Sequence, residues 1–308
     1  MKRPELLLPI AAGLVAGSAH RQIARSLGCA PSTVTRLAAR IGRHALLLQA
    51  LAMQHLESLE EPVVFDHFET FVFSQQDRLG IATPVGQKSW FSYGLDPAPH
   101  RGGGRRSARK RALRRPLPQQ QPGSVVQSTK RVFELLLGLS GGSVELISDD
   151  HPAYTHAERS AGILGSIHRR IYPNPPRGPG SDQAVARERD RQMFAVDLLH
   201  KLWRHSQAHQ RRETIAFGRR SNAVMERGFL FIVWRNFVKK VSERTGEAIT
   251  PAMRLGLVPR PLEWSQVFSQ RLFPGRIRLP QGWMKIYRRG WITPAVGRNL
   301  PHALTQAF

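Results

Sequence analysis

Residues 143–151 read SVELISDDH, a short apolar run that ends in two adjacent aspartates. The run predicts a buried strand, and the glycine pair before it predicts the end of a helix over residues 128–140. Three Val- and Phe-rich segments upstream, at 61–73, 79–85 and 88–95, also predict strands. We therefore expect the order strand, strand, strand, helix, strand, and with it a mixed α/β fold.

Two of these strands carry an aspartate at or near the point where they leave the core. Asp66 lies within residues 61–73, EPVVFDHFETFVF, and Asp149 directly follows the fourth strand. A single aspartate at a strand end is most often a turn or capping residue, so neither is informative alone. Asp150 is adjacent to Asp149, and the sequence leaves open which of the two would bind a ligand.

A third carboxylate lies on an amphipathic helix predicted over residues 221–244. Glu226 is in its first turns, four residues after Asn222, and two arginines, Arg219 and Arg220, come just before it. These basic side chains are expected either to hold a DNA backbone or to form a solvated face. The histidines of the chain show no zinc-binding spacing, so they are expected to be solvated or to face DNA.

The amino-terminal residues predict three helices, over 6–16, over 20–27 and from Pro31 onward. Ser18 is expected to cap the second helix, and Gly28 supplies the positive φ of a tight turn. A helix, a short turn and a second helix form a helix-turn-helix, which reads the major groove of DNA. A plain helical hairpin used for packing is the alternative. The positions expected to face DNA are Ser32, Thr33, Thr35, Arg36 and Arg40.

The composition favours a polyanionic partner. The chain has 308 residues, with 46 Lys and Arg against 22 Asp and Glu, for a formal net charge of +24. Such a surplus binds phosphates because each contact releases condensed counterions. Residues 101–115, RGGGRRSARKRALRR, form the densest basic run; within it Arg105, Arg106, Arg109, Lys110 and Arg111 are expected to contact nucleic acid. Charge alone would suit an RNA-binding protein equally well. With a single cysteine and no long apolar run, we expect a cytoplasmic protein that does not enter a membrane.

Taken together, these motifs resemble the DDE transposases of bacterial insertion sequences. The residues around Asp66, the stretch from Asp149 to Tyr154 and the Asn222–Glu226 spacing resemble the three acidic motifs of that family, in the same order. The resemblance implies a ribonuclease H-like catalytic domain in which the first and fourth strands lie side by side. It further implies that Asp66, Asp149 and Glu226 bind two Mg²⁺ or Mn²⁺ ions that cleave and join strands of double-stranded DNA. A homo-oligomer is implied as well.

The same resemblance divides the chain into parts. Residues 1–50 would be the helix-turn-helix domain, 60–245 the catalytic domain with a basic loop at 99–123, and 246–308 a basic, Trp-rich segment. The long gap between the second and third acidic motifs departs from the family and implies a helical insertion at about 177–219. A non-catalytic DNA-binding regulator, or a domesticated transposase that has lost catalysis, remains the alternative.

Overall fold

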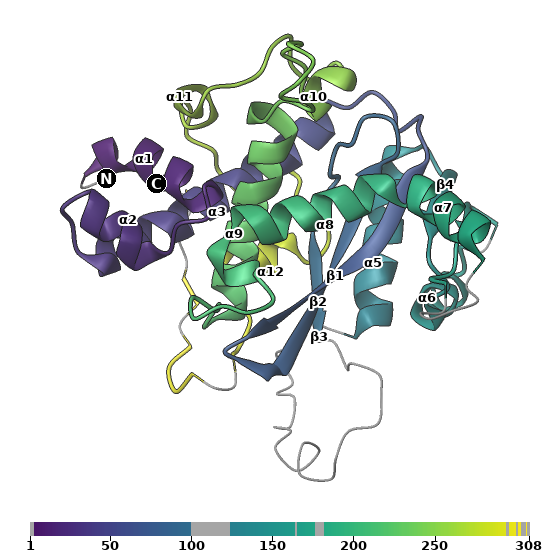
Figure 1. Ribbon diagram of the computed structural model, residues 1–308, viewed down its shortest axis with the longest axis horizontal. Helices are drawn as coiled ribbons and strands as arrows, with labels where there is room; N and C mark the ends of the chain where they lie inside the picture. Colours follow the sequence, from purple (N-terminus) through teal and green to yellow (C-terminus); the bar gives the residue numbers. More distant parts are fainter. Residues whose placement is uncertain are drawn as a thin grey trace.

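Five strands form one mixed sheet in this computed structural model, which describes residues 3–99, 124–163, 165–175, 182–293, 296–299, 301–302 and 306 (Figure 1). The strands are β1 (Val63–Val72), β2 (Ser74–Gly86), β3 (Asp96–Pro99), β4 (Val144–Ser148) and β5 (Ile167–Ile171). Their spatial order is β3-β2-β1-β4-β5, with β1, β2 and β3 antiparallel and β4 and β5 parallel to β1. The α/β prediction is confirmed, and so is the expectation that the first and fourth strands are neighbours.

The predicted third strand was placed too early in the chain. Residues 88–95 form a turn and an irregular segment, and β3 begins only at Asp96. The carboxylate of Glu61 explains the turn, because it accepts hydrogen bonds from the backbone N–H groups of Lys88 and Ser89, at 2.7 and 2.8 Å. Backbone groups held by a side chain in this way are not available to a strand ladder.

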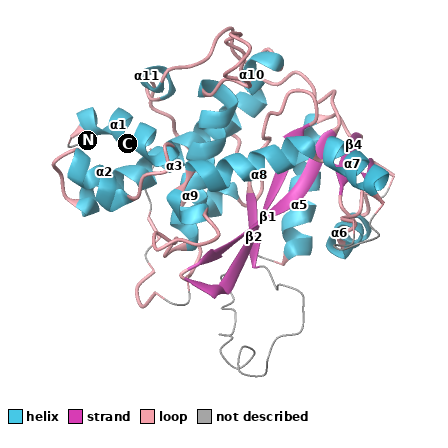
Figure 2. Ribbon diagram, viewed as in Figure 1, coloured by secondary structure: helices cyan, strands magenta, loops and turns pink. Residues whose placement is uncertain are grey.

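Helices cover both faces of the sheet. Phe65 and Phe68 of β1 point to opposite faces, because side chains alternate along a strand. Phe65 packs against α5 (Val125–Leu139) and α6 (Pro152–Ala161), whereas Phe68 packs against α8 (Phe194–Ser206). Figure 2 shows α8 crossing in front of the strands. The helical insertion expected at about 177–219 contains two helices, α7 (Gln183–Gln192) and α8, and α8 packs on the sheet as part of the fold itself.

The amino-terminal helices are α1 (Leu7–Val15), α2 (His20–Ser26) and α3 (Pro31–Gln54), preceded by the short η1 (Pro4–Leu6). Gly28 has a φ of 58°, as the turn requires. The expected cap is wrong: the residue before α2 is Ala19, whose N–H donates to the Gln22 side chain at 2.8 Å. The third helix runs on for 24 residues and packs along α9 (Ser221–Val233) (Figure 1).

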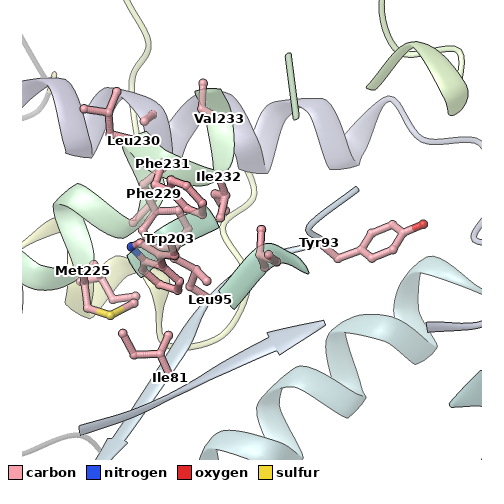
Figure 3. Close-up of a cluster of buried hydrophobic side chains, with 14 of the residues drawn as sticks. Ile81, Tyr93, Leu95, Trp203, Met225, Phe229, Leu230, Phe231, Ile232 and Val233 are labelled. Carbon is pink, nitrogen blue, oxygen red and sulfur yellow. The ribbon is translucent and has the colours of Figure 1, made fainter. Parts of the chain in front are cut away.

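The core between α9 and the sheet is aromatic. Figure 3 shows residues of α9 gathered around Trp203 of α8, with Ile81 and Leu95 beyond it. At Trp234 the helix changes into a π-helical turn, η3 (Trp234–Val238). Four short helices complete the described fold: η2 (Ala208–Gln210), α10 (Pro251–Arg254), α11 (Trp264–Val267) and α12 (Trp283–Tyr287). Within the described ranges, no helix has the length and apolar character needed to cross a membrane.

Candidate active site

The pairing of β1 with β4 brings two of the predicted carboxylates together. Val64 pairs with Ile147 and Phe65 with Ser148, so the next positions in register are Asp66 and Asp149. In parallel strands, side chains at matching positions lie on the same side of the sheet. The two carboxylates therefore lie beside each other where β4 ends.

The electrostatics of this pair are unfavourable without a cation. Burial, and then the negative charge of Asp149, raise the pKa of Asp66 to about 7. Burial also raises the pKa of Asp149. Asp66 Oδ1 accepts a hydrogen bond from the His67 N–H at 2.7 Å, and Asp149 Oδ2 accepts one from Asn174 at 3.2 Å. Asp149 Oδ1 is buried and has no hydrogen-bond partner among the described residues. An orphaned carboxylate oxygen beside a second carboxylate fits a divalent cation.

Helix α8 adds two further groups to the same face. Asp197 and His200 lie three residues apart, about one turn of the helix, so both can point toward the sheet. The Nδ1 atom of His200 is 3.8 Å from Asp66 Oδ2. The charge of Asp197 also contributes to the raised pKa of Asp66. Asp197 itself pairs with Arg189. Neither residue belonged to the sequence-based site; a carboxylate and an imidazole at helical spacing were the signal that could have found them.

The hydrogen bonds of His200 fix its tautomer. The hydroxyl of Thr83 donates its only proton to the Asp66 carbonyl at 2.8 Å, so at 2.7 Å it must accept from His200 Nε2. Nε2 then carries the ring proton, and Nδ1 presents a lone pair toward Asp66. Burial lowers the pKa of His200 to about 3, which keeps the ring neutral. The expectation that the histidines are solvated is wrong for His200, which the structure makes a potential ligand.

Glu226 lies elsewhere. Its carboxylate is 2% exposed and 3.0 Å from both Arg43 Nη1 and Arg289 Nε. Asn222, the other residue of the predicted glutamate motif, donates to the backbone carbonyls of Arg289 and Trp291. The motif thus ties α9 to α3 and to the carboxy-terminal segment.

One layer of side chains separates α9 from the sheet. The ring of Trp203 on α8 stacks on Phe68 of β1 at 4.5 Å and on Phe231 of α9 at 5.4 Å. The structure consequently does not bring Glu226 to Asp66 and Asp149. Over the part of the chain that it describes, no three His, Cys, Asp or Glu side chains are close enough together to hold a metal ion.

The predicted DNA-contacting residues fall into three groups. On α3, Ser32, Thr35 and Arg36 are exposed, while Thr33 and Arg40 are partly exposed, as a groove-reading face requires. Near α9, Arg219 is exposed and lies over the Phe217 ring, and Arg220 donates to the Arg298 carbonyl at 2.8 Å. The five candidates of the basic run, Arg105, Arg106, Arg109, Lys110 and Arg111, lie outside the described residues.

Comparisons with known proteins give little further guidance. No protein-family model matches the chain, and no curated protein matches it in sequence. Among solved structures, one chain of a simian T-cell lymphotropic virus intasome, determined in complex with PP2A regulatory subunit B56 gamma, is similar at 12% identity and a TM-score of 0.29. That match covers 86% of this chain and 74% of the other. A TM-score this low does not establish a common fold, so function must be inferred from the chain's own residues.

The carboxylate pair predicts a pH-dependent stability. A pKa near 7 for Asp66, against about 3.9 in an unfolded chain, means that the folded state holds an extra proton between these values. Stability should therefore fall as pH rises through this window, by roughly 2–4 kcal/mol. Thermal unfolding in EDTA from pH 4 to pH 8 measures this change of stability with pH. We expect Asp66→Asn to flatten the slope and raise Tm at pH 8, and Mg²⁺ to stabilise the wild type only. An unchanged slope in Asp66→Asn would contradict the assignment.

Proposed function

We propose that this chain is a transposase-type polynucleotidyl transferase, which cleaves DNA strands and joins them to new positions with divalent metal ions. The observation that supports the proposal most directly is the pairing of Asp66 with Asp149, one oxygen of which has no partner among the described residues. A formal net charge of +24 makes a nucleic acid the natural substrate for such a site. The proposal includes a homo-oligomer acting on double-stranded DNA.

Asp66 and Asp149 would hold Mg²⁺ or Mn²⁺, since Mg²⁺ is commonly bound by one or two carboxylates together with water and substrate phosphate. Two such ions, when bound, activate the attacking oxygen and stabilise the leaving oxygen of an in-line displacement at phosphorus. We propose that ion binding would draw in a third ligand from α8, either the Nδ1 lone pair of His200 or the carboxylate of Asp197, because the described side chains are not close enough to supply three ligands as they stand. This replaces Glu226, whose carboxylate is already paired with two arginines.

Residues around Asp66 orient its carboxylate and place positive charge beside it. The Thr83 hydroxyl orients the ring of His200, whose Nδ1 faces Asp66 Oδ2. The Tyr154 hydroxyl lies 3.4 Å from the other carboxylate oxygen, Asp66 Oδ1. Each oxygen of the Asp66 carboxylate therefore has a polar neighbour. Arg189 contributes positive charge to both Asp66 and Asp149 while it pairs with Asp197. A guanidinium here can bind a phosphate that enters the site. Water would be the nucleophile for cleavage and a freed 3′-hydroxyl for joining.

The helix-turn-helix would place the exposed start of α3 in the major groove. We expect Arg36→Ala to weaken binding to the recognised sequence about tenfold or more, because a bidentate contact to a base contributes about 1–3 kcal/mol. Fluorescence anisotropy with specific and scrambled duplexes measures the change. Arg244→Ala, which removes an exposed arginine from a distant loop, is the matched control and should bind normally. Equal losses in both variants would indicate charge alone, as in a non-specific RNA- or DNA-binding protein.

A cleavage assay tests the function itself. The substrate is DNA from the ends of the element that carries this gene, incubated with protein and Mg²⁺, Mn²⁺ or EDTA. Metal-dependent nicks at the ends are the expected result. A non-catalytic DNA-binding regulator is the second candidate, and the lack of three convergent metal ligands among the described residues favours it. That candidate predicts tight binding to the ends with no cleavage in either metal.

A further inference from the structure

Arg235 is a buried cation with no counterion among the described residues. It is the second residue of η3, it is 2% exposed, and its Nη1 atom has no hydrogen-bond partner among the described residues. Burying an unpaired charge is costly, and such groups normally acquire a partner. An anion would stabilise the Arg235 guanidinium, and the described part of the chain does not supply one.

Aromatic rings and a second arginine surround it. The guanidinium of Arg235 lies 5.8 Å from the centre of the Trp90 ring, and that of Arg254 lies 5.0 Å from the same ring. Phe194 packs on Trp90 with ring centres 5.5 Å apart. Arg254 is exposed and donates to the Lys88 carbonyl at 2.9 Å. Two guanidinium groups thus lie near one indole ring. Arg254 and Phe194 are the members of this cluster that are exposed to solvent.

The nearby acidic residue is already occupied. Glu61 accepts hydrogen bonds from two backbone N–H groups of the Trp90 loop and from the Tyr93 hydroxyl. Within the described ranges, Arg235 Nη1 has no partner, and Arg254 donates to a backbone carbonyl rather than to a carboxylate. Burial, and then repulsion from Arg254, lower the pKa of Arg235 to about 10, and no carboxylate opposes that shift. The cluster is positively charged, and no acidic side chain of the described residues neutralises it.

The backbone holds this cluster in place. The π-helical turn sets Arg235 inward, and π-turns inside helices are often found at functional sites. The adjacent Asn236 is fixed by hydrogen bonds to Ser92 and to Gln49. Trp90 has a φ of 61°, which is unfavourable for a bulky residue and persists only where the surroundings impose it.

The cluster adjoins the start of α8, the helix that also carries Asp197 and His200. Phe194 is the first residue of α8, and Asp197 follows it by three residues, about one helical turn, or ~5 Å along the axis. A DNA strand that reaches Asp66 would carry other backbone phosphates at comparable spacing. We propose that Arg235, Arg254 and Trp90 form a phosphate-binding site for the strand held at Asp66 and Asp149. The identity of that strand rests on the proposed function, whereas the need of Arg235 for an anion does not.

The test replaces Arg235 by methionine in the Asp66→Asn protein, so that binding is measured without cleavage. We expect the dissociation constant for end DNA to rise about tenfold and the salt dependence of binding to fall by about one phosphate contact. We also expect Tm without DNA to rise by a few degrees, because an unpaired buried cation is removed. A structural arginine would behave oppositely: Tm would fall and the affinity of the folded protein would not change.

Controls separate the possible ligands. Arg191→Met removes an exposed arginine that pairs with Glu188, and it should leave both measurements unchanged. If inorganic phosphate raises the Tm of Asp66→Asn but not of the double variant, while both proteins bind DNA equally, the cluster binds a free anion and the DNA proposal is overturned. Equal affinity and equal salt dependence in both proteins would overturn it as well. An absence of cleavage by the wild type would instead refute the proposed function and leave these binding results intact.

Discussion

The Asp66→Asn protein is expected to bind the ends of its DNA normally and to cleave them slower by a factor on the order of a thousand or more. The amide keeps the shape of the side chain but loses the negative charge that would hold the metal ions. Single-turnover cleavage in Mg²⁺, with protein in excess over DNA, measures the loss, and anisotropy confirms that binding is retained. Full cleavage by Asp66→Asn would rule out the catalytic assignment.

Neighbouring variants identify the other ligands in the same assay. Asp149→Asn should match the loss in Asp66→Asn, and Asp150→Asn, at an exposed adjacent carboxylate, should cleave normally. The larger loss of cleavage, in Asp197→Asn or in His200→Ala, should identify the third ligand on α8. His200→Gln keeps a polar side chain of similar size and so tests whether the imidazole itself is needed. Glu226→Gln, measured per folded molecule, should retain cleavage. A loss in Glu226→Gln as large as that in Asp66→Asn would return the third position to α9.

Local sequence patterns were enough to predict most of the sheet. The apolar runs around Asp66 and before Asp149 predicted the two strands that matter, and the resemblance to a ribonuclease H-like fold implied that they pair. Periodicity was enough to locate the strands, whereas their pairing was expected from the resemblance. The limits of β3 were missed because a long-range side chain, Glu61, decides whether residues 88–95 can pair.

The third candidate metal ligand could not be predicted from local sequence patterns. A helix whose apolar face suits packing does not reveal which layer of the protein it joins. Residues 177–219 were expected to form an insertion, but Trp203 packs directly on β1 and so places His200 beside Asp66. Glu226 had the spacing of a catalytic motif, yet it pairs with Arg43, which is 183 residues away in the sequence.

That ion pair joins α3, the helix predicted to read DNA, to the core. Arg43 lies on the second half of α3, whose first half carries the helix-turn-helix face. A side chain at Gly42 would lie 2.3 Å from the Glu226 carbonyl oxygen, so α3 and α9 are in backbone contact. One continuous helix, α3, therefore connects the predicted groove-reading surface to α9, which packs on α8. The orientation of DNA relative to Asp66 would depend on this junction.

Glu226→Ala should consequently destabilise the protein by about 3–5 kcal/mol, because it leaves the buried Arg43 and the partly exposed Arg289 without their shared carboxylate. Chemical denaturation, followed by circular dichroism, measures the change. Glu213→Ala, at an exposed glutamate, is the control and should unfold like the wild type. The double variant Glu226→Ala/Arg43→Met should recover part of the loss, since one of the two unpaired cations is gone. A double variant less stable than Glu226→Ala would show that Arg43 stabilises α3 independently of Glu226. A recovery would instead show that charge balance at the junction, rather than metal binding, accounts for a glutamate at this position.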